Sequence, residues 1–147
     1  MPMQLTTSRF TAGGPIPSRY TCDGEDVSPP LVIGGVPAGT KTLALVVDDP
    51  DAPAGVWDHW IVFNIPPEVR EIPENTEPAG VHGIGTSGNT AYHGPCPPDR
   101  EHRYFFKVYA LDTKLVLPEG ASKKDVEQAM AGHILDQTEL MGRYERQ

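Results

Sequence analysis

The sequence predicts a mainly β domain with one helix late in the chain, on three observations. Its 147 residues include 16 prolines and 15 glycines, which make turns frequent and exclude long helices from most of the chain. Three apolar runs, at 42–47, 59–65 and 104–111, are bounded by turn residues. One amphipathic segment follows them. The length fits a single domain over residues 1–147, with one core.

Each predicted strand is justified by how its run ends. A short strand at 31–33 is closed by two glycines, and the run 42–47 leads into an acidic, proline-containing turn. The run 59–65 ends at Pro66, because proline cannot donate to a β ladder. Residues 66–98 are rich in Gly, Pro and small polar side chains, so we expect mostly loop there, of the kind that usually has a function.

The helix is predicted from its start signal and its apolar spacing. Ser122 can cap it and Asp125 follows three positions later, before an apolar stripe made of Val126, Ala129, Met130, His133 and Ile134. His133 is therefore expected at the edge of the core. Gly132 offers an earlier end for the helix, at Met130. Residues 138–144 are a candidate final strand that Gly142 weakens.

Charge and hydropathy exclude several partners. The net charge is −8 and the one basic pair is Lys123-Lys124, so nucleic acid is not an expected partner. Anionic lipid headgroups would repel such a surface, which argues against stable membrane attachment. The chain shows no signal-peptide pattern and no apolar run of membrane-spanning length, and we expect a cytoplasmic protein.

The chain contains two cysteines, Cys22 and Cys96. Two are too few to define a disulfide scaffold, and a reducing cytosol disfavours a bond between them. Both nevertheless lie in motifs that are discussed below and could bring them together. The sequence leaves open whether they are bonded.

The acidic turn after 42–47 is the strongest functional signal. It reads Asp48-Asp49-Pro50-Asp51-Ala52-Pro53, and its prolines restrict the backbone that carries the carboxylates. His59, His102 and Tyr104 also lie near strand ends and supply hydrogen-bond donors. A pocket that combined them would suit a small anion, with phosphate fitting best. The Ala52–Pro53 bond is a candidate cis peptide, because cis-proline fixes tight turns.

Several motifs, in order, resemble the phosphatidylethanolamine-binding protein family, and most closely its small bacterial and archaeal branch of Raf kinase inhibitor-like proteins. The resemblance covers about 10–144 and rests on Tyr20-Thr21-Cys22-Asp23-Gly24, Asp49-Pro50-Asp51-Ala52-Pro53, Gly94-Pro95-Cys96-Pro97-Pro98 and His102-Arg103-Tyr104. It implies two antiparallel sheets with Greek-key connections and one or two peripheral helices. The stretch 96–101 departs from the more glycine-rich pattern of longer relatives, and this departure affects the rim of the pocket and the role of Pro98 there.

The resemblance also implies a binding site and a kind of function. The ligand-binding residues would be Asp49, Asp51, His59, Gly94, Pro98, His102 and Tyr104, with Asp51 mainly bracing the loop and backbone near Gly94 approaching the anion. His82 and His93 have no matched role. We expect a non-catalytic protein that binds a small phosphorylated or anionic ligand and needs no cofactor or metal. The alternative is an inhibitor of a protein kinase or serine protease that uses the surface around the pocket. A homodimer is a further possibility that the branch suggests.

Simpler or different chemistries remain open from the residues alone. Asp49 and Asp51 suit an ordinary strand-ending turn, and His59 and His102 could be structural. The same four side chains could hold a divalent metal ion, although no tight ligand spacing supports one. Cys96 with either histidine could form a thiol hydrolase, but the flanking prolines suggest a structural loop. The stretch 85–89 lacks the last glycine of a serine-hydrolase motif.

Overall fold

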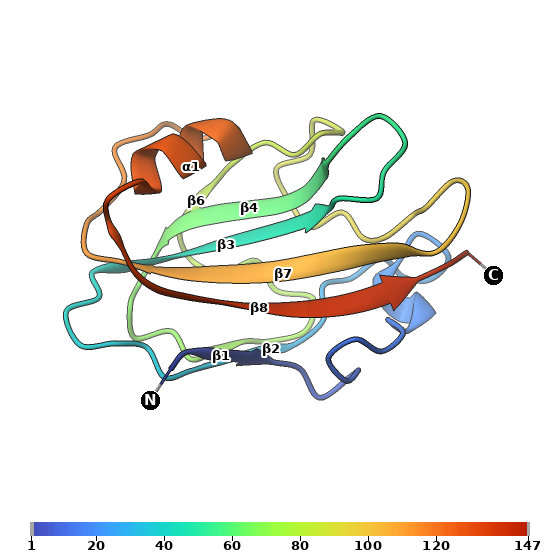
Figure 1. Ribbon diagram of the computed structural model, residues 1–147, viewed down its shortest axis with the longest axis horizontal. Helices are drawn as coiled ribbons and strands as arrows, with labels where there is room; N and C mark the ends of the chain where they lie inside the picture. The colour runs from blue at the N-terminus through green and yellow to red at the C-terminus, as the bar shows by residue number, and fades with distance from the viewer. Residues whose placement is uncertain (1, 147) are drawn as a thin grey trace.

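Two antiparallel sheets form the protein in a computed structural model that describes residues 2–146 (Figure 1). The larger sheet has the order β6 (Val81–His82), β4 (Trp57–Ile65), β3 (Thr42–Asp49), β7 (His102–Leu111) and β8 (Ile134–Tyr144). The smaller has the order β1 (Gln4–Thr6), β2 (Leu31–Gly34) and β5 (Glu71–Ile72). The prediction of a mainly β fold with two antiparallel sheets is confirmed.

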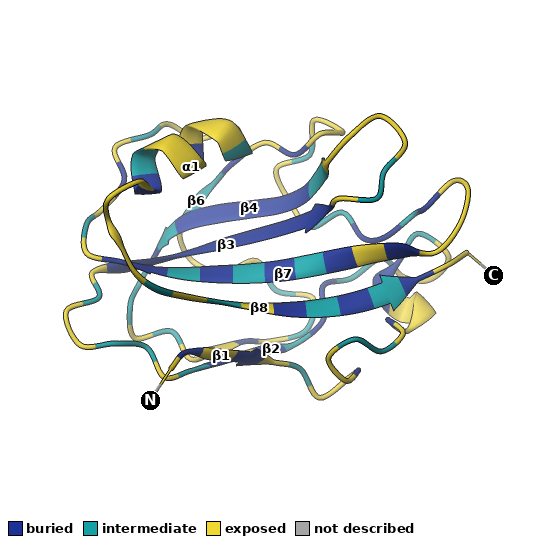
Figure 2. Cartoon of the chain, in the orientation of Figure 1, coloured by how far each residue is buried: buried dark blue, intermediate teal, exposed yellow. Residues whose placement is uncertain are grey.

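Strand β3 lies at the centre of the larger sheet and is buried on both faces. All eight of its residues are buried, which explains why its sequence is a continuous apolar run rather than an alternating one (Figure 2). One face contributes Leu43, Leu45 and Val47 to the core between the sheets. The other face, through Ala44, packs in a second core with the helix.

The helix α1 (Lys123–Met130) packs against one end of the outer face of the larger sheet, near β4 and β6 (Figure 1). The Ser122 side chain accepts a hydrogen bond from the Asp125 N–H, and the Asp125 side chain accepts one from the Ser122 N–H, so the capping box is complete. Val126 and Met130 point into the core beside Ile61 and Phe63. A 3₁₀ turn at Ser18–Tyr20 is a second short helical element.

Strand β7 alternates because its outer face is only partly covered. His102, Tyr104 and Phe106 are buried on the inner side, whereas Arg103 is exposed and Phe105 half-buried on the outer side. The first part of β7 therefore directs one imidazole and one phenol toward the other sheet. This alternation positions the site described below.

Several sequence predictions need correction. The helix ends at Met130, as the earlier end at Gly132 allowed, so His133 is exposed and bonded to Asp112 rather than placed at the core edge. The final strand begins at Ile134, four residues before the predicted start. No cis peptide occurs within residues 2–146, so the Ala52–Pro53 bond is trans. The short strands β1, β5 and β6 were not predicted.

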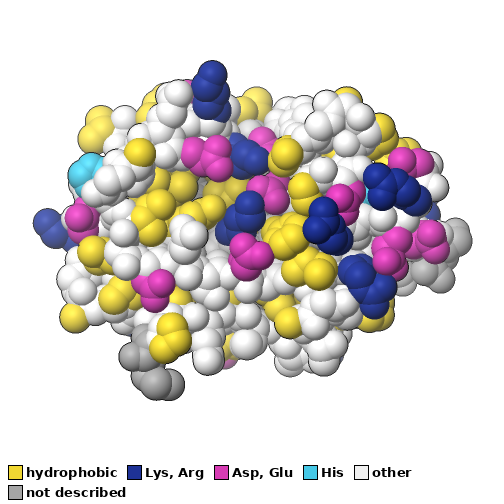
Figure 3. Space-filling model, in the orientation of Figure 1, with side chains coloured by type: hydrophobic (Ala, Val, Ile, Leu, Met, Phe, Trp, Pro, Cys, Tyr) yellow, Lys and Arg dark blue, Asp and Glu magenta, His cyan; other side chains and the backbone are white. Residues whose placement is uncertain are grey.

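The surface charge and the length of the helices bear on whether the protein has a nucleic-acid or membrane partner, which the sequence argues against. Figure 3 shows acidic and basic side chains interspersed on the face that carries α1. On that face Lys107 and Lys123 share the buried carboxylate of Asp48, at 3.1 and 3.3 Å. In the part of the chain that the structure describes, no helix is long and apolar enough to cross a membrane.

Candidate functional site

The site begins where β3 ends, because consecutive side chains of a strand point to opposite faces. Asp48 points outward to its lysine partners, and Asp49 points inward, where its side chain is 4% exposed. One Asp49 oxygen accepts the Asp51 N–H at 2.8 Å. The other lies 2.7 Å from Nδ1 of His102. The acidic turn thus fixes one carboxylate inside the protein.

His102 lies between two carboxylates. Its Nδ1 faces Asp49 and its Nε2 lies 2.7 Å from Oδ1 of Asp99. Because an ionised carboxylate only accepts hydrogen bonds, both ring nitrogens donate and the ring is an imidazolium. Burial opposes this charge, but the hydrogen bonds to Asp49 and Asp99 outweigh it and raise the pKa of His102 above 6.5.

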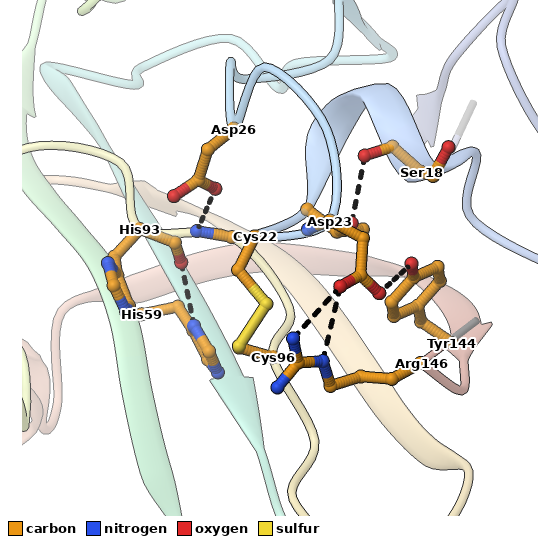
Figure 4. Close-up of a disulfide and its surroundings, with 11 residues drawn as sticks. Ser18, Cys22, Asp23, Asp26, His59, His93, Cys96, Tyr144 and Arg146 are labelled. Atoms are coloured by element: carbon orange, nitrogen blue, oxygen red, sulfur yellow. Dashed lines mark hydrogen bonds and ion pairs between the residues drawn. A yellow bond between two sulfur atoms is a disulfide. The ribbon is translucent and has the colours of Figure 1, made fainter.

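His59, on β4, has a different environment in the same pocket. Its Nδ1 donates to the backbone carbonyl of His93 at 2.7 Å, which fixes the tautomer because a carbonyl cannot donate (Figure 4). The ring is neutral, since burial lowers the pKa of His59 below 6.5 against the smaller opposing effects of the His93 carbonyl and the Asp49 charge. The Nε2 atom is therefore left as an acceptor.

Tyr104 lies between the two histidines. Its ring meets that of His59 edge-on at 5.4 Å and stacks on that of His102 at 6.4 Å, between centroids. Burial, followed by the negative charge of Asp49, raises the pKa of Tyr104, so the phenol keeps its proton. Its hydroxyl is buried close to the Asp49 carboxylate, but no hydrogen bond of normal distance and angle reaches it from residues 2–146. A buried unpaired hydroxyl is costly unless something else bonds to it.

These groups surround a cavity of about 200 Å³. Its lining combines a few polar side chains with apolar ones; the lining residues are Asp49, Ala52, Pro53, Trp57, His59, His93, Cys96, Pro97, Pro98, His102 and Tyr104. A mostly apolar pocket with a few convergent polar groups is the usual form of a small-molecule site. The size admits a small molecule or the end of a larger one.

A disulfide between Cys22 and Cys96 ties the pocket loop to the N-terminal region (Figure 4). The structure thereby answers the question that the sequence left open. Two hydrogen bonds accompany it, from the Cys22 N–H to the Pro95 carbonyl at 3.1 Å and from the Tyr92 hydroxyl to the Tyr20 carbonyl at 2.7 Å. The wall of the pocket formed by this loop is therefore fixed covalently.

The structure brings five of the seven predicted site residues into the cavity lining: Asp49, His59, Pro98, His102 and Tyr104. Asp51 lies outside it and binds the Arg103 side chain through both oxygens, at 2.8 and 2.9 Å, which suits the bracing role. Gly94 also lies outside. Its N–H donates to Asp26, and a Cβ there would be 2.2 Å from the Tyr20 carbonyl oxygen. The glycine permits close chain packing rather than an approach to the ligand.

Sequence reasoning missed three contributors. His93 supplies the carbonyl that orients His59, and Trp57 contributes an aromatic wall. Asp99 binds His102 from the stretch 96–101, where the family pattern gave no guide. One sequence signal could have identified the Asp99–His102 contact. The two residues are three positions apart, on either side of the boundary between the loop and β7.

Two of the three alternative chemistries can be compared with the structure. Cys96 is bonded to Cys22 and has no free thiol, which removes the nucleophile of a thiol hydrolase. Among the described residues, no group of three or more His, Cys, Asp or Glu side chains is arranged to hold a metal ion.

Comparison with known proteins identifies the family of the chain. The family model described as phosphatidylethanolamine-binding protein matches residues 6–145. A UPF0098 protein of Methanothermobacter thermautotrophicus is 55% identical, over 98% of this chain and 99% of its own. A solved phosphatidylethanolamine-binding protein homologue from Chlamydia trachomatis is 46% identical with a TM-score of 0.96, over 99% of each chain. YbcL of Escherichia coli, described as a member of the mammalian family, is 33% identical with a TM-score of 0.92 over the full length of both.

The chain therefore belongs to the phosphatidylethanolamine-binding protein family. The resemblance inferred from the sequence motifs is confirmed. Membership establishes the fold and places the chain in a family of ligand-binding proteins. What this chain itself binds has to be argued from its own pocket.

Proposed function

We propose that the pocket binds a small anion, or the phosphoryl group of a larger molecule, and catalyses no reaction. The observation that carries the proposal is the Tyr104 hydroxyl, a protonated donor that is buried at the cavity and makes no hydrogen bond of normal distance and angle within residues 2–146. An anionic oxygen is the acceptor that satisfies such a donor best, because hydrogen bonds to charged groups are about twice as strong as neutral ones.

The two histidines support the same ligand class. His102 carries a positive charge at the cavity, and His59 presents an Nε2 that bonds to none of the described residues and becomes a donor if it takes up a proton. A bound anion favours that proton, so binding should raise the pKa of His59. Asp49 offers the complementary acceptor for an amine, a hydroxyl or a protonated phosphate oxygen. The apolar walls would contact the rest of the ligand.

Two-dimensional ¹H–¹⁵N NMR with inorganic phosphate and then phosphoethanolamine tests the proposal. We expect saturable shifts around His59, His102 and Tyr104. Tyr104→Phe, which removes only the hydroxyl, should weaken phosphate binding at least about fivefold, as the loss of a hydrogen bond to a charged group predicts. Tyr109→Phe is the matched control, because Tyr109 is on the same strand but lies outside the cavity.

The alternative outcome is equally informative. If millimolar phosphate and phosphoethanolamine cause no saturable shifts at the cavity, the anion-binding proposal is rejected. The search would then turn to protein targets such as a kinase or a protease, for which the pocket would be part of a larger contact surface.

A further inference from the structure

The Asp99 carboxylate occupies the one atom through which His102 could bind a ligand. Nδ1 of His102 is held by Asp49, whose side chain is 4% exposed and whose position is fixed by the turn. Nε2 is therefore the ring's remaining donor, and Asp99 accepts from it at 2.7 Å. An incoming anion and Asp99 would compete for the same proton.

The two partners of His102 differ in how firmly they are held. The Asp99 side chain is 43% exposed, about ten times the exposed fraction of Asp49. Its other contacts are local, with the adjacent Arg100. Water can solvate the exposed Asp99 carboxylate once it leaves His102, so the Asp99 contact is broken at lower cost than the contact with the buried Asp49.

The chain segment around Asp99 can move away from His102 because it is exposed between two buried residues. Pro97 is buried beside the disulfide-bonded Cys96, and His102 is buried at the start of β7. The four residues between these anchors, 98–101, are all exposed. A rotation of one side chain, or a small shift of this segment, frees Nε2 without disturbing either anchor.

We propose that Asp99 is a built-in competitor that occupies the anion-binding donor of His102 in the unliganded protein and is displaced when an anion binds. This inference rests on the proposed function. It implies that the pocket selects ligands able to outcompete a tethered carboxylate, which favours a phosphoryl group, with its several charged oxygens, over a simple carboxylate. It also implies that Asp99 keeps the buried imidazolium paired while the pocket is empty.

The test measures inorganic phosphate binding by NMR in the wild type, in Asp99→Ala and in Glu101→Ala. Glu101 is the matched control, because it lies two residues away, is similarly exposed and pairs with Arg143 instead of His102. Removing the competitor should tighten phosphate binding up to about fivefold in Asp99→Ala. Glu101→Ala should change it less than about twofold, since exposed charges beyond the contact are screened.

A second readout separates competition from general electrostatics. Phosphate should barely change the pKa of His102 in the wild type, because one anionic acceptor replaces another. In Asp99→Ala the unliganded pKa of His102 should fall and phosphate should restore it. Equal affinity in the wild type and Asp99→Ala, or equal effects of the two variants, would overturn the competitor while leaving the anion pocket intact. Failure of all three proteins to bind phosphate would overturn the pocket, and the competitor with it.

Discussion

The pocket has a histidine on each of two walls, and the two walls shift the pKa of their histidine in opposite directions. His59 on β4 and His102 on β7 are both buried and contact the same tyrosine, yet the pKa of His59 is lowered and that of His102 is raised. The difference comes from the partners. The His93 carbonyl fixes the tautomer of His59 but opposes the effect of burial too weakly to keep that ring charged, whereas the two carboxylates at His102 outweigh burial. Burial alone would have lowered both.

The largest expected effect comes from releasing the loop that supplies a partner to each wall. His93 and Asp99 flank Cys96, whose disulfide with Cys22 closes a loop of sequence separation 74. The double variant Cys22→Ser/Cys96→Ser should lose about 4 kcal/mol of unfolding free energy, mainly through the entropy of the unfolded chain. Urea denaturation measures it, and wild type in strong reductant should match the variant. A loss below about 1 kcal/mol would contradict the covalent contribution.

The next effect separates the two partners of His102. Asp49→Asn leaves a buried imidazolium without its buried counter-charge and should cost about 3 kcal/mol of unfolding free energy. Asp99→Asn should cost far less, because its side chain is exposed to water. Urea denaturation of both variants at neutral pH gives the comparison. Equal losses would show that the buried and exposed carboxylates hold the ring alike.

A pH titration sharpens the comparison without a mutation. Followed by NMR, His102 should titrate above 6.5 and His59 below it. The signs for stability are opposite. The contribution of His102 is present below 6.5 and is lost as pH rises through its folded-state pKa. The penalty from His59 begins as pH falls below 6.5, where the unfolded chain takes up a proton that the folded ring resists. A His59 midpoint above that of His102 would invalidate the assignment of their partners.

The sequence predicted the elements that have local signals and missed those that depend on contacts with distant parts of the chain. The strands β3, β4 and β7 and the capped helix were predictable because apolar runs, prolines and a capping box are local signals. The two-residue strands β5 and β6 were not, since they exist only through pairing with distant strands. His133 was misplaced because the apolar spacing continued across Gly132, whose φ of +81° ends the helical path.

The site divides in the same way. The motifs that resemble the family identified Asp49, His59, His102 and Tyr104, all of which line the cavity. Their chemical states could not be read from the motifs, because these depend on a carbonyl of His93 and on the Asp99 carboxylate. The sequence named both histidines as donors to an anion. In the structure His59 is neutral, and both ring nitrogens of His102 already bond to carboxylates.

The smallest expected effect concerns the ion pair just outside the pocket, which tests whether Asp51 braces the turn that presents Asp49. The hydrogen bonds from Arg103 outweigh the opposing effect of burial and hold the pKa of Asp51 at about 2. Its stabilising contribution is therefore present above 3.8 and is lost as pH falls through about 2. Arg103→Ala should raise the Asp51 pKa toward 3.8, as carboxyl ¹³C NMR would detect, and should leave the His102 titration nearly unchanged. Because Arg103 is exposed, the loss of unfolding free energy should be slight. A large shift in the His102 titration would contradict this expectation. It would mean that the Asp51–Arg103 ion pair also positions Asp49 inside the pocket.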